Sequence, residues 1–179
     1  NSRVKWGLHD GSAWTRKGWA ENRDAAALDQ AWLTLEAPDQ VLVSNVAGEP
    51  ARHMLVNCLT RWTVETRWIT SVAEQCGVRN HYDIPAQLGC DRCAALIAAW
   101  RRCSGGCVVV NAGTAVTVDA LSDDGEFLGG MIVPGLAPMR HALVSRTTRL
   151  AVEPGNFSLF PRNTADAVYS GILSATAGA

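Results

Sequence analysis

The chain has 179 residues, of which 47% are hydrophobic and 18% charged, and a formal net charge of -1 at pH 7. These proportions are typical of a folded globular protein and exclude a disordered chain. Because there is no excess of positive charge, sequence-independent binding to nucleic acid is not expected.

Nothing in the chain resembles a membrane segment. The longest unbroken apolar stretch, residues 94–100, is far shorter than the roughly 20 residues of a membrane-spanning helix. No charged start followed by an apolar core marks a signal peptide. We therefore expect a cytoplasmic protein without a membrane or nucleic-acid partner.

The chain opens inside a strand-like stretch over residues 2–8, which leads into a tight turn at Asp10-Gly11. Residues 114–120 repeat this pattern, again with a hydroxyl residue first and with a turn at Asp124-Gly125 behind them. Such an internal repeat predicts two similar halves, each presenting a hydroxyl-bearing turn to one cleft. Two such turns would together clamp a phosphate. Because the chain starts within a strand, we also expect further sequence upstream.

Helices and strands are predicted to alternate in the first half of the chain. Apolar residues recur at helical spacing over residues 20–36, where Pro38 ends the helix, and again over residues 49–62. Short apolar stretches at residues 41–46 and 64–70 are typical of buried strands. This alternation indicates an α/β layer fold, with most of the seven tryptophans on core faces.

Residues 76–89 have no periodicity and are expected to form a loop. The loop leads to Asp91 and Arg92, at the opening of a helix that continues to Arg102. Two interpretations are open. In the first, Asp91 only complements the helix dipole beside a solvated Arg92. In the second, the carboxylate deprotonates a substrate hydroxyl while the guanidinium binds an anionic group.

Four cysteines lie close together in this region. Cys90 and Cys93 form a C-x2-C pair, and Cys103 and Cys107 follow as C-x3-C. This spacing resembles that of zinc ligands. However, Cys93 shares a helical face with Leu96, and the first pair lacks the turns of a zinc knuckle. We therefore favour cysteines that pack in the core over a zinc site or a disulfide framework.

A predicted hairpin is the most informative part of the chain. A β-branched run reaches Asn111, turns at residues 112–114, and returns as an alternating strand over residues 116–121. The short turn allows a ligand to come close, and Thr114 and Thr117 add hydroxyl donors. This design suits an anion, although an ordinary β-meander would show the same pattern.

A third short strand, residues 126–128, is expected after this hairpin, followed by Gly129-Gly130 and Pro134-Gly135. These glycines would again let the backbone approach a bound group. Apolar spacing then predicts a helix beyond Leu136, and Asn163-Thr164 caps a last helix. The chain ends without a terminating strand, so the C-terminal side also looks incomplete.

Three separate stretches fall into one family pattern. Asn1-Ser2 and the strand behind it resemble the end of a D-x-G-N-[ST] phosphate turn, and Gly89-Cys90-Asp91-Arg92 resembles a G-x-D-R motif. Residues 113–117 and 129–136 resemble the G-T-A-x-T and G-G-x-I-x-P-G-L segments. In this order and spacing, the three stretches resemble type III pantothenate kinase. The resemblance is greatest to the proteobacterial branch that includes the Bvg accessory factor.

The resemblance implies a duplicated fold of the acetate kinase, Hsp70 and actin type, with ribonuclease-H-like halves over residues 1–104 and 105–179. It implies transfer of the ATP γ-phosphoryl group to pantothenate, which gives 4'-phosphopantothenate in the first step of coenzyme A synthesis. Mg²⁺ and a monovalent cation, K⁺ or NH₄⁺, would assist the reaction. The protein would be a homodimer.

Residue roles follow from the same resemblance. Asp91 would be the base on the pantothenate hydroxyl, and Thr164 would reach pantothenate across the dimer. Such roles suit phosphoryl transfer, because that reaction needs positioning and charge neutralisation more than covalent chemistry. The remaining pantothenate contacts would be Tyr82, Gly89 and Arg92, and the phosphate contacts would be Asn1, Ser2, Gly113, Thr114 and Thr117.

Two features depart from the family pattern. The acidic residue expected before Asn1 is absent from this chain, and Asn111 stands where the family has aspartate before its A-G-T or C-G-T turn. An amide oxygen can coordinate a monovalent cation but brings no negative charge. These departures leave a second hypothesis open, an inactive relative that binds a regulatory partner or metabolite.

Overall fold

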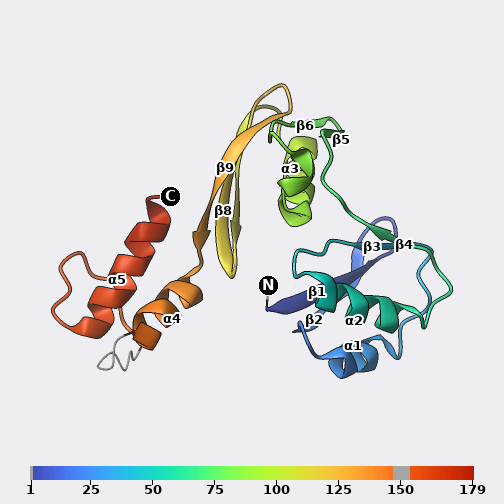
Figure 1. Ribbon diagram of the computed structural model, residues 1–179, viewed down its shortest axis with the longest axis horizontal. Helices are drawn as coiled ribbons and strands as arrows, with labels where there is room; N and C mark the ends of the chain where they lie inside the picture. Colours follow the sequence, from blue (N-terminus) through green and yellow to red (C-terminus); the bar gives the residue numbers. More distant parts are fainter. Residues whose placement is uncertain (1, 147–153) are drawn as a thin grey trace. The chain divides into compact units, whose positions relative to one another are not determined.

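The computed structural model describes residues 2–146 and 154–179 (Figure 1). Its chain forms two compact units, which we describe separately. The first unit comprises Asn1–Ser71 and Ala86–Asp91, and the second comprises Val72–Pro85 and Arg92–Ala179. No helix within the described residues is long and apolar enough to cross a membrane.

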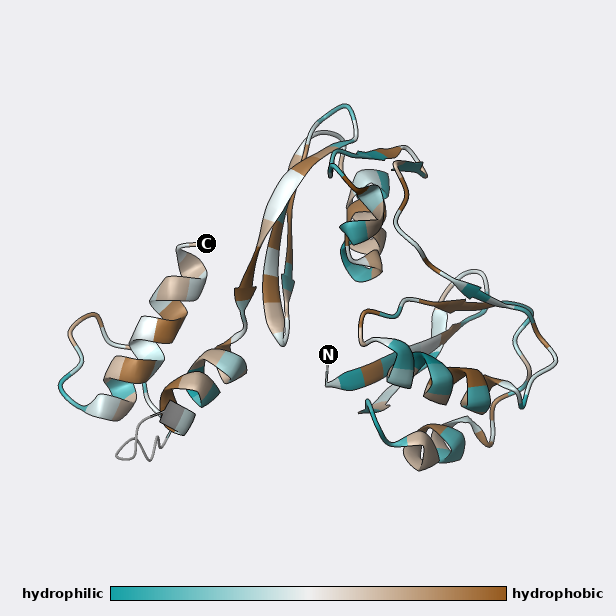
Figure 2. Ribbon diagram, viewed as in Figure 1, coloured by the Kyte–Doolittle hydropathy of each residue, from teal (hydrophilic) through white to brown (hydrophobic). Residues whose placement is uncertain are grey.

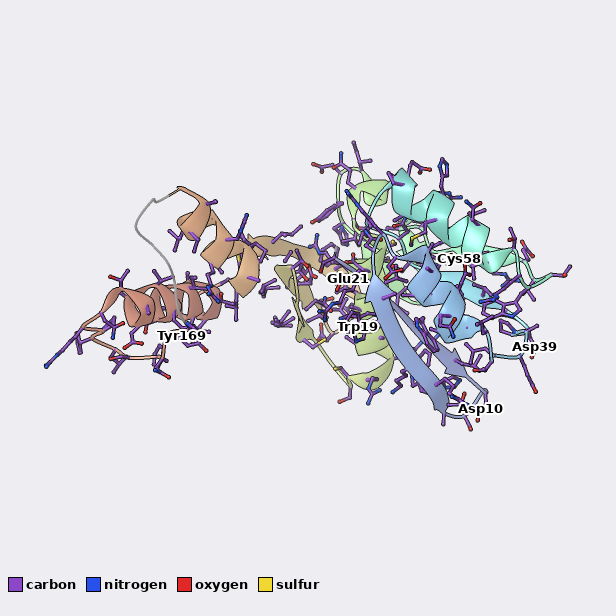
Figure 3. All side chains as sticks on the ribbon, turned by 90° about the horizontal axis from the view of Figure 1, so that it is seen from below. Asp10, Trp19, Glu21, Asp39, Cys58 and Tyr169 are labelled. Atoms are coloured by element: carbon purple, nitrogen blue, oxygen red, sulfur yellow. The ribbon has the colours of Figure 1, made fainter. Side chains whose placement is uncertain are left out.

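The first unit begins with an antiparallel hairpin of β1 (Arg3–His9) and β2 (Trp14–Glu21). Its tip is organised by Asp10, which is labelled in Figure 3. The Asp10 carboxylate accepts hydrogen bonds from the backbone N–H groups of Ala13 and Ser12, both at 2.8 Å. These bonds favour the ionised form and lower the pKa of Asp10 to about 2. The predicted first strand and its tight turn are confirmed.

The helix expected over residues 20–36 is shorter than predicted. Helix α1 spans Ala25–Trp32, and Asp24 caps it by accepting a hydrogen bond from Ala27 N at 2.9 Å. A capping side chain fixes the point at which a helix can start. Ala20 therefore belongs to β2 and not to the helix. It is apolar because it is buried on the inner face of that strand.

A strand–helix–strand unit follows. It consists of β3 (Val41–Val43), α2 (Glu49–Leu59) and β4 (Thr66–Trp68), and the two strands pair in parallel. Figure 2 shows hydrophobic and hydrophilic residues mixed along α2, as expected of a helix with one buried face. Both predicted strands and the second predicted helix are confirmed, although the strands are shorter than the apolar stretches of the sequence.

Aromatic and aliphatic side chains fill the core of this unit. Trp32 lies at its centre, with Trp6 edge-on at 6.3 Å and Trp62 at 5.5 Å between ring centroids. Trp14 and Trp19, both on β2, are 58% and 55% exposed, so the prediction of a core position fails for these two. The buried members of the core are Ala20, Leu28, Trp32, Leu55, Cys58 and Leu59.

The second unit is built on a five-stranded sheet in the order β5-β6-β9-β8-β7. Residues 76–89, expected to be a loop, contain a strand of this sheet and a short 3₁₀ helix. The strand was missed because its three residues, Val78–Asn80, contain no apolar run of the kind that marks β3. The bounds are β5 (Glu74–Gln75), β6 (Val78–Asn80), η1 (Pro85–Gln87), β7 (Cys107–Ala112), β8 (Ala115–Leu121) and β9 (Glu126–Pro134).

The predicted hairpin is confirmed as β7 and β8, but the third strand is longer than predicted. Strand β9 continues through Gly129 and Gly130 instead of ending before them. The pairing of β8 and β9 is irregular between Ala120 and Leu121, and opposite this point Gly129 has a φ of 132°. A glycine is tolerated there because a side chain would be strained at such a φ.

Helix α3 (Cys90–Arg102) confirms the helix predicted from Asp91 to Arg102. In the second unit its Trp100 packs on two glycines in turns of the sheet, Gly77 between β5 and β6 and Gly125 between β8 and β9. A Cβ on Gly77 would lie 2.7 Å from Trp100 Nε1, and one on Gly125 would lie 3.3 Å from the same ring. The two glycines therefore let the helix approach the sheet closely.

Two helices complete the second unit, α4 (Leu136–Arg146) and α5 (Thr164–Ala177), and they pack against each other. Asn163 caps α5 by accepting a hydrogen bond from Asp166 N at 2.8 Å. Thr164 is therefore the first residue of the helix and not its cap. The Asp166 carboxylate accepts hydrogen bonds from Asn156 N and from the Asn163 amide, and these bonds lower the pKa of Asp166. They also hold the segment before α5 against the start of the helix.

Candidate active site

Three polar side chains occupy one face of the sheet in the second unit. Thr117 and Asp119 lie two residues apart on β8, and Asn111 is paired with Thr117 across the β7–β8 ladder. Residues two apart in a strand project to the same side. Thr117 and Asp119 are both buried, at 8% and 0% exposure. Buried polar side chains on a strand need partners, and the partners define the site.

The partner of Asp119 is Arg92, in the first turn of α3. Arg92 Nε lies 3.1 Å from both carboxylate oxygens of Asp119, and Nη2 contacts Oδ1 as well. The side chains are 5% and 0% exposed. The hydrogen bonds that Arg92 donates to Asp119 raise the pKa of the Arg92 guanidinium, although burial alone would lower it. The interpretation of Arg92 as a solvated residue is therefore wrong.

The same guanidinium also holds Tyr82. Arg92 Nη1 donates a hydrogen bond to the Tyr82 hydroxyl at 2.9 Å. The Tyr82 ring packs on the fully buried Phe127, with 5.4 Å between ring centroids. Arg92 thus connects Asp119 on one side to Tyr82 on the other. Of the residues predicted to bind pantothenate, the structure brings Tyr82 and Arg92 into direct contact.

Gly130 makes room for this arrangement. A Cβ at this position would lie 2.6 Å from Val118 O and 2.9 Å from Arg92 Nη2, and closer still to Asp119 Oδ1. The sequence predicted that the glycines of this segment admit a bound group. At Gly130 that expectation is wrong, because the space beside its Cα is filled by the ion pair of the protein itself.

The hairpin turn between β7 and β8 is packed in a similar way. The amide nitrogen of Asn111 donates to Thr117 Oγ1 at 3.3 Å, behind the turn. Gly135 N donates to Thr114 O at 2.8 Å, and a Cβ on Gly135 would collide with Gly113 O. The predicted close approach at Gly135 is therefore one of backbone to backbone. Gly113 and Thr114 remain exposed at the turn itself.

A pocket of about 300 Å³ lies in the first unit, where the chain leaves the parallel strands. Asn45 and Val46 follow β3, and Ser71 follows β4. Gly89 immediately precedes α3, and Cys90 is its first residue. Ligands of α/β proteins commonly bind beyond the carboxyl ends of parallel strands. Within the described residues, the buried hydroxyl of Ser71 has no hydrogen-bond partner. The pocket therefore combines space, a helix N-terminus and a hydroxyl available to a ligand.

Asp91 stands next to this pocket. It is exposed and lies in the first turn of α3, as predicted. Its carboxylate lies over Gly89, since a Cβ on Gly89 would be 2.6 Å from Asp91 Oδ1. A glycine at this position thus leaves the carboxylate free of a steric clash with the preceding turn.

The other predicted site residues lie elsewhere. Ser2 is exposed at the start of the first unit, where its carbonyl accepts a hydrogen bond from Asn22 N at 2.9 Å. Asn1 lies outside the described residues. Thr164 is exposed at the start of α5. These positions stay predictions as contacts to substrate.

The interpretation of these cysteines as core residues is confirmed for Cys90 and Cys93 but is wrong for Cys103. Cys90 and Cys93 are buried in α3, whereas Cys103 is exposed and Cys107 half-buried. The Cys90 thiol donates to the backbone oxygen of Asn45 at 3.5 Å. Within residues 2–146 and 154–179, no three histidine, cysteine or acidic side chains are grouped as metal ligands.

Asp119 was missed by the sequence analysis. The alternation of the predicted strand places Asp119 on the buried face with Thr117 and Leu121. A carboxylate on a buried face is rare unless it is paired. A charged residue at a position expected to be buried therefore indicates an ion pair, and this is the signal in the sequence that points to Asp119.

Comparison with known proteins decides the family. A sequence profile described as "Type III pantothenate kinase" matches residues 1–179, the whole of this chain. The chain belongs to the type III pantothenate kinase family. The predicted resemblance is thereby confirmed, and the mixed α/β architecture of both units is consistent with this family.

Relatives named type III pantothenate kinase align with this family member over its full length. The relative from Nitrosospira multiformis is 53% identical over 100% of this chain and 68% of its own length. The relative from Nitrosomonas eutropha is 50% identical over 100% of this chain and 70% of its own length. A crystal structure from Campylobacter jejuni, named for a Baf family of transcriptional activators, is 25% identical. It covers 89% of this chain and 67% of its own, with a TM-score of 0.55.

Proposed function

We propose that this chain phosphorylates pantothenate with ATP to give 4'-phosphopantothenate, the first step of coenzyme A synthesis. The observation that carries this proposal is the family match over all 179 residues, with relatives up to 53% identical that are named type III pantothenate kinase. No comparison favours the alternative of an inactive regulatory relative. A cytoplasmic location stays a prediction.

Asp91 is the proposed base on the pantothenate hydroxyl. Its exposed carboxylate at the start of α3 is accessible to a substrate, and the pocket that includes Gly89 leaves room for one. A carboxylate accepts or orients the proton of the attacking hydroxyl as the new bond to phosphorus forms. As that bond forms, the bond between the γ-phosphorus and the oxygen that bridges it to the β-phosphate breaks, so that ADP is the leaving group. The proton of the hydroxyl passes to the Asp91 carboxylate.

Tyr82, Gly89, Arg92 and Thr164 are the proposed pantothenate contacts. The Arg92–Tyr82 hydrogen bond supports a shared task for these two residues. Thr164 would act across a homodimer. Support for the dimer comes from the segment before α5, where Leu159 is 80% and Phe160 is 86% exposed. Exposed apolar side chains of this size favour burial against another surface.

Ser2, Gly113, Thr114 and Thr117, together with Asn1, are the proposed phosphate contacts. The exposed turn at Gly113 and Thr114 supports this, because backbone N–H groups and hydroxyls suit phosphate oxygens. Mg²⁺ commonly takes most of its ligands from substrate phosphates and water. We therefore assign the Mg²⁺ ligands mainly to ATP. Bound there, Mg²⁺ would neutralise phosphate charge.

Asn111 is the proposed ligand of a monovalent cation, K⁺ or NH₄⁺. Its amide nitrogen donates to Thr117, an orientation in which the amide oxygen is the atom that can bind a cation. An amide dipole attracts K⁺ less strongly than a carboxylate would. We therefore propose a weak cation site at this position.

The duplicated ribonuclease-H-like fold, with halves at residues 1–104 and 105–179, belongs to the same proposal. Two hairpins support it. The turns after β1 and after β8 both contain Asp-Gly, and their glycines Gly11 and Gly125 have φ values of 98° and 80°. Each unit also has one pair of parallel strands, β3 with β4 and β6 with β9.

The test is release of ADP by the full chain from ATP and pantothenate, with K⁺ or NH₄⁺ supplied. Turnover that depends on pantothenate is expected. Binding of pantothenate in calorimetry without any turnover would instead support the inactive relative, and neither binding nor turnover would refute the proposed substrate.

A further inference from the structure

The geometry points to Asp119 as a positioning residue for pantothenate, which acts by fixing Arg92 and, through Arg92, the hydroxyl of Tyr82. This inference rests on the proposed function, because it assumes that Tyr82 and Arg92 face the substrate. Asp119 itself is fully buried. Its role is therefore to orient the side chains that touch substrate and not to touch it.

The contacts join Asp119, Arg92 and Tyr82 into one continuous arm. Asp119 accepts from both Nε and Nη2 of Arg92, which fixes the plane of the guanidinium. With that plane fixed, Nη1 lies 2.9 Å from the Tyr82 hydroxyl. The Tyr82 ring is supported from the other side by Phe127. Each member of the arm is thus held by the one behind it, and the carboxylate of Asp119 is the anchor.

Fold stability alone is a poor explanation for this buried pair. Replacing a buried ion pair by apolar residues of similar volume is often neutral or stabilising, because removing two charges from water is costly. The pair also requires a glycine at position 130, where a Cβ would lie 2.9 Å from Arg92 Nη2. The Arg92–Asp119 pair is costly to bury and needs the space that Gly130 leaves in β9. Its presence is better explained by the orientation that it gives to Arg92 and Tyr82.

The pair also changes what Arg92 can do. Its positive charge is compensated by Asp119 at hydrogen-bonding distance. Asp119 therefore reduces the attraction of Arg92 for an anionic group of the substrate. The remaining contribution of Arg92 is the direction of its N–H donors, which point to Tyr82 and would reach a ligand beside Tyr82. Loss of Asp119 would strengthen that attraction, so weaker binding of pantothenate in its absence would report disorder of Arg92 and Tyr82 and not the change of charge.

The test is Asp119→Asn, measured by kcat and KM for both substrates. The amide keeps the size of the side chain, but its NH₂ group replaces one of the two oxygens that accept from Arg92 Nε, and the negative charge is lost. A bond to a charged group is worth about 10- to 100-fold in an equilibrium. We expect the KM for pantothenate to rise by about that factor, with the KM for ATP nearly unchanged. Asp124→Asn, in the exposed turn after β8, is the matched control and should leave both values unchanged.

A double-mutant cycle with Tyr82→Phe separates positioning from general destabilisation. If Asp119 acts through Tyr82, then Tyr82→Phe should cost much less in the Asp119→Asn background than in the wild type. In the Asp124→Asn background its cost should be undiminished. Additive effects of Asp119→Asn and Tyr82→Phe, or a pantothenate KM unchanged by Asp119→Asn, would overturn the inference.

Two controls keep the experiment decisive. If Asp119→Asn does not fold, Arg92→Lys replaces it in the cycle, since lysine keeps the charge beside Asp119 but lacks the planar fork that reaches Tyr82. Additivity in that cycle would equally overturn the inference. The wild type is measured first. A wild-type chain that neither turns over nor binds pantothenate refutes the proposed function, whereas an active wild type with an additive cycle refutes only the role of Asp119.

Discussion

Gly130→Ala tests whether the space beside the Arg92–Asp119 pair is needed. The added Cβ would lie 2.6 Å from Val118 O and 2.9 Å from Arg92 Nη2, and closer still to the Asp119 carboxylate. Neither side can yield easily, because Val118 O is backbone in the middle of β8 and Asp119 is fully buried. Overpacking of this kind costs about 1 to 3 kcal/mol.

In a chain of this size, each kcal/mol lowers the melting temperature by about 2 to 4 °C. We therefore expect Gly130→Ala to melt about 2 to 12 °C below the wild type in circular dichroism. The pantothenate KM should rise as well, because Asp119 can make room only by moving Arg92. Gly171→Ala in α5 is the control. Its Cβ would meet nothing within 4 Å, so it should be neutral or slightly stabilising.

The result that would refute this reasoning is a Gly130→Ala chain as stable as the wild type with an unchanged pantothenate KM. The pair would then tolerate a shift of the strand, and its geometry would not be fixed by Gly130. A loss of stability without a change in KM would show that the clash is relieved away from Arg92, for example by movement of β9.

Three further predictions concern the proposed site. Asp91→Asn should lower turnover by about 100- to 10,000-fold with little change in melting temperature, and near-normal turnover would reduce Asp91 to a helix-start acid. Asn111→Asp should lower the K⁺ concentration for half-maximal activity, and K⁺-independent activity in both proteins would remove the cation role. Thr164→Ala should raise the pantothenate KM, whereas Asn163→Ala should cost α5 about 0.5 to 2 kcal/mol of stability and leave the KM unchanged. A monomer at assay concentration would contradict the shared site.

Long periodic elements were predictable from the sequence. The β7–β8 hairpin, α3 and the last helix each carry their own pattern over enough residues to be recognised without tertiary information. The G-x-D-R stretch also placed Asp91 correctly in the first turn of α3. In these segments the local preference and the final fold agree, which is the usual condition for successful prediction.

Strands β6 and β9 were not predictable in full. Strand β6 has three residues and is stabilised by pairing with β9, a partner far away in sequence. Strand β9 runs through two glycines that ordinarily weaken a strand, because Gly129 adopts a positive φ and Gly130 gives space to Asp119. Both errors have the same cause: the stabilising contact comes from another part of the chain.

The ion pair of Arg92 and Asp119 could have been predicted from the sequence. Asp119 alternates with residues on the buried face of a predicted strand, and Arg92 lies four residues before the buried Leu96, on the same face of a predicted helix. Each charge is too costly to bury alone, so each requires an opposite charge on a buried face. The two positions therefore predict each other, although 27 residues separate them. Only the structure adds that the pair also reaches Tyr82, because that contact depends on the orientation of the guanidinium and not on which residues are buried.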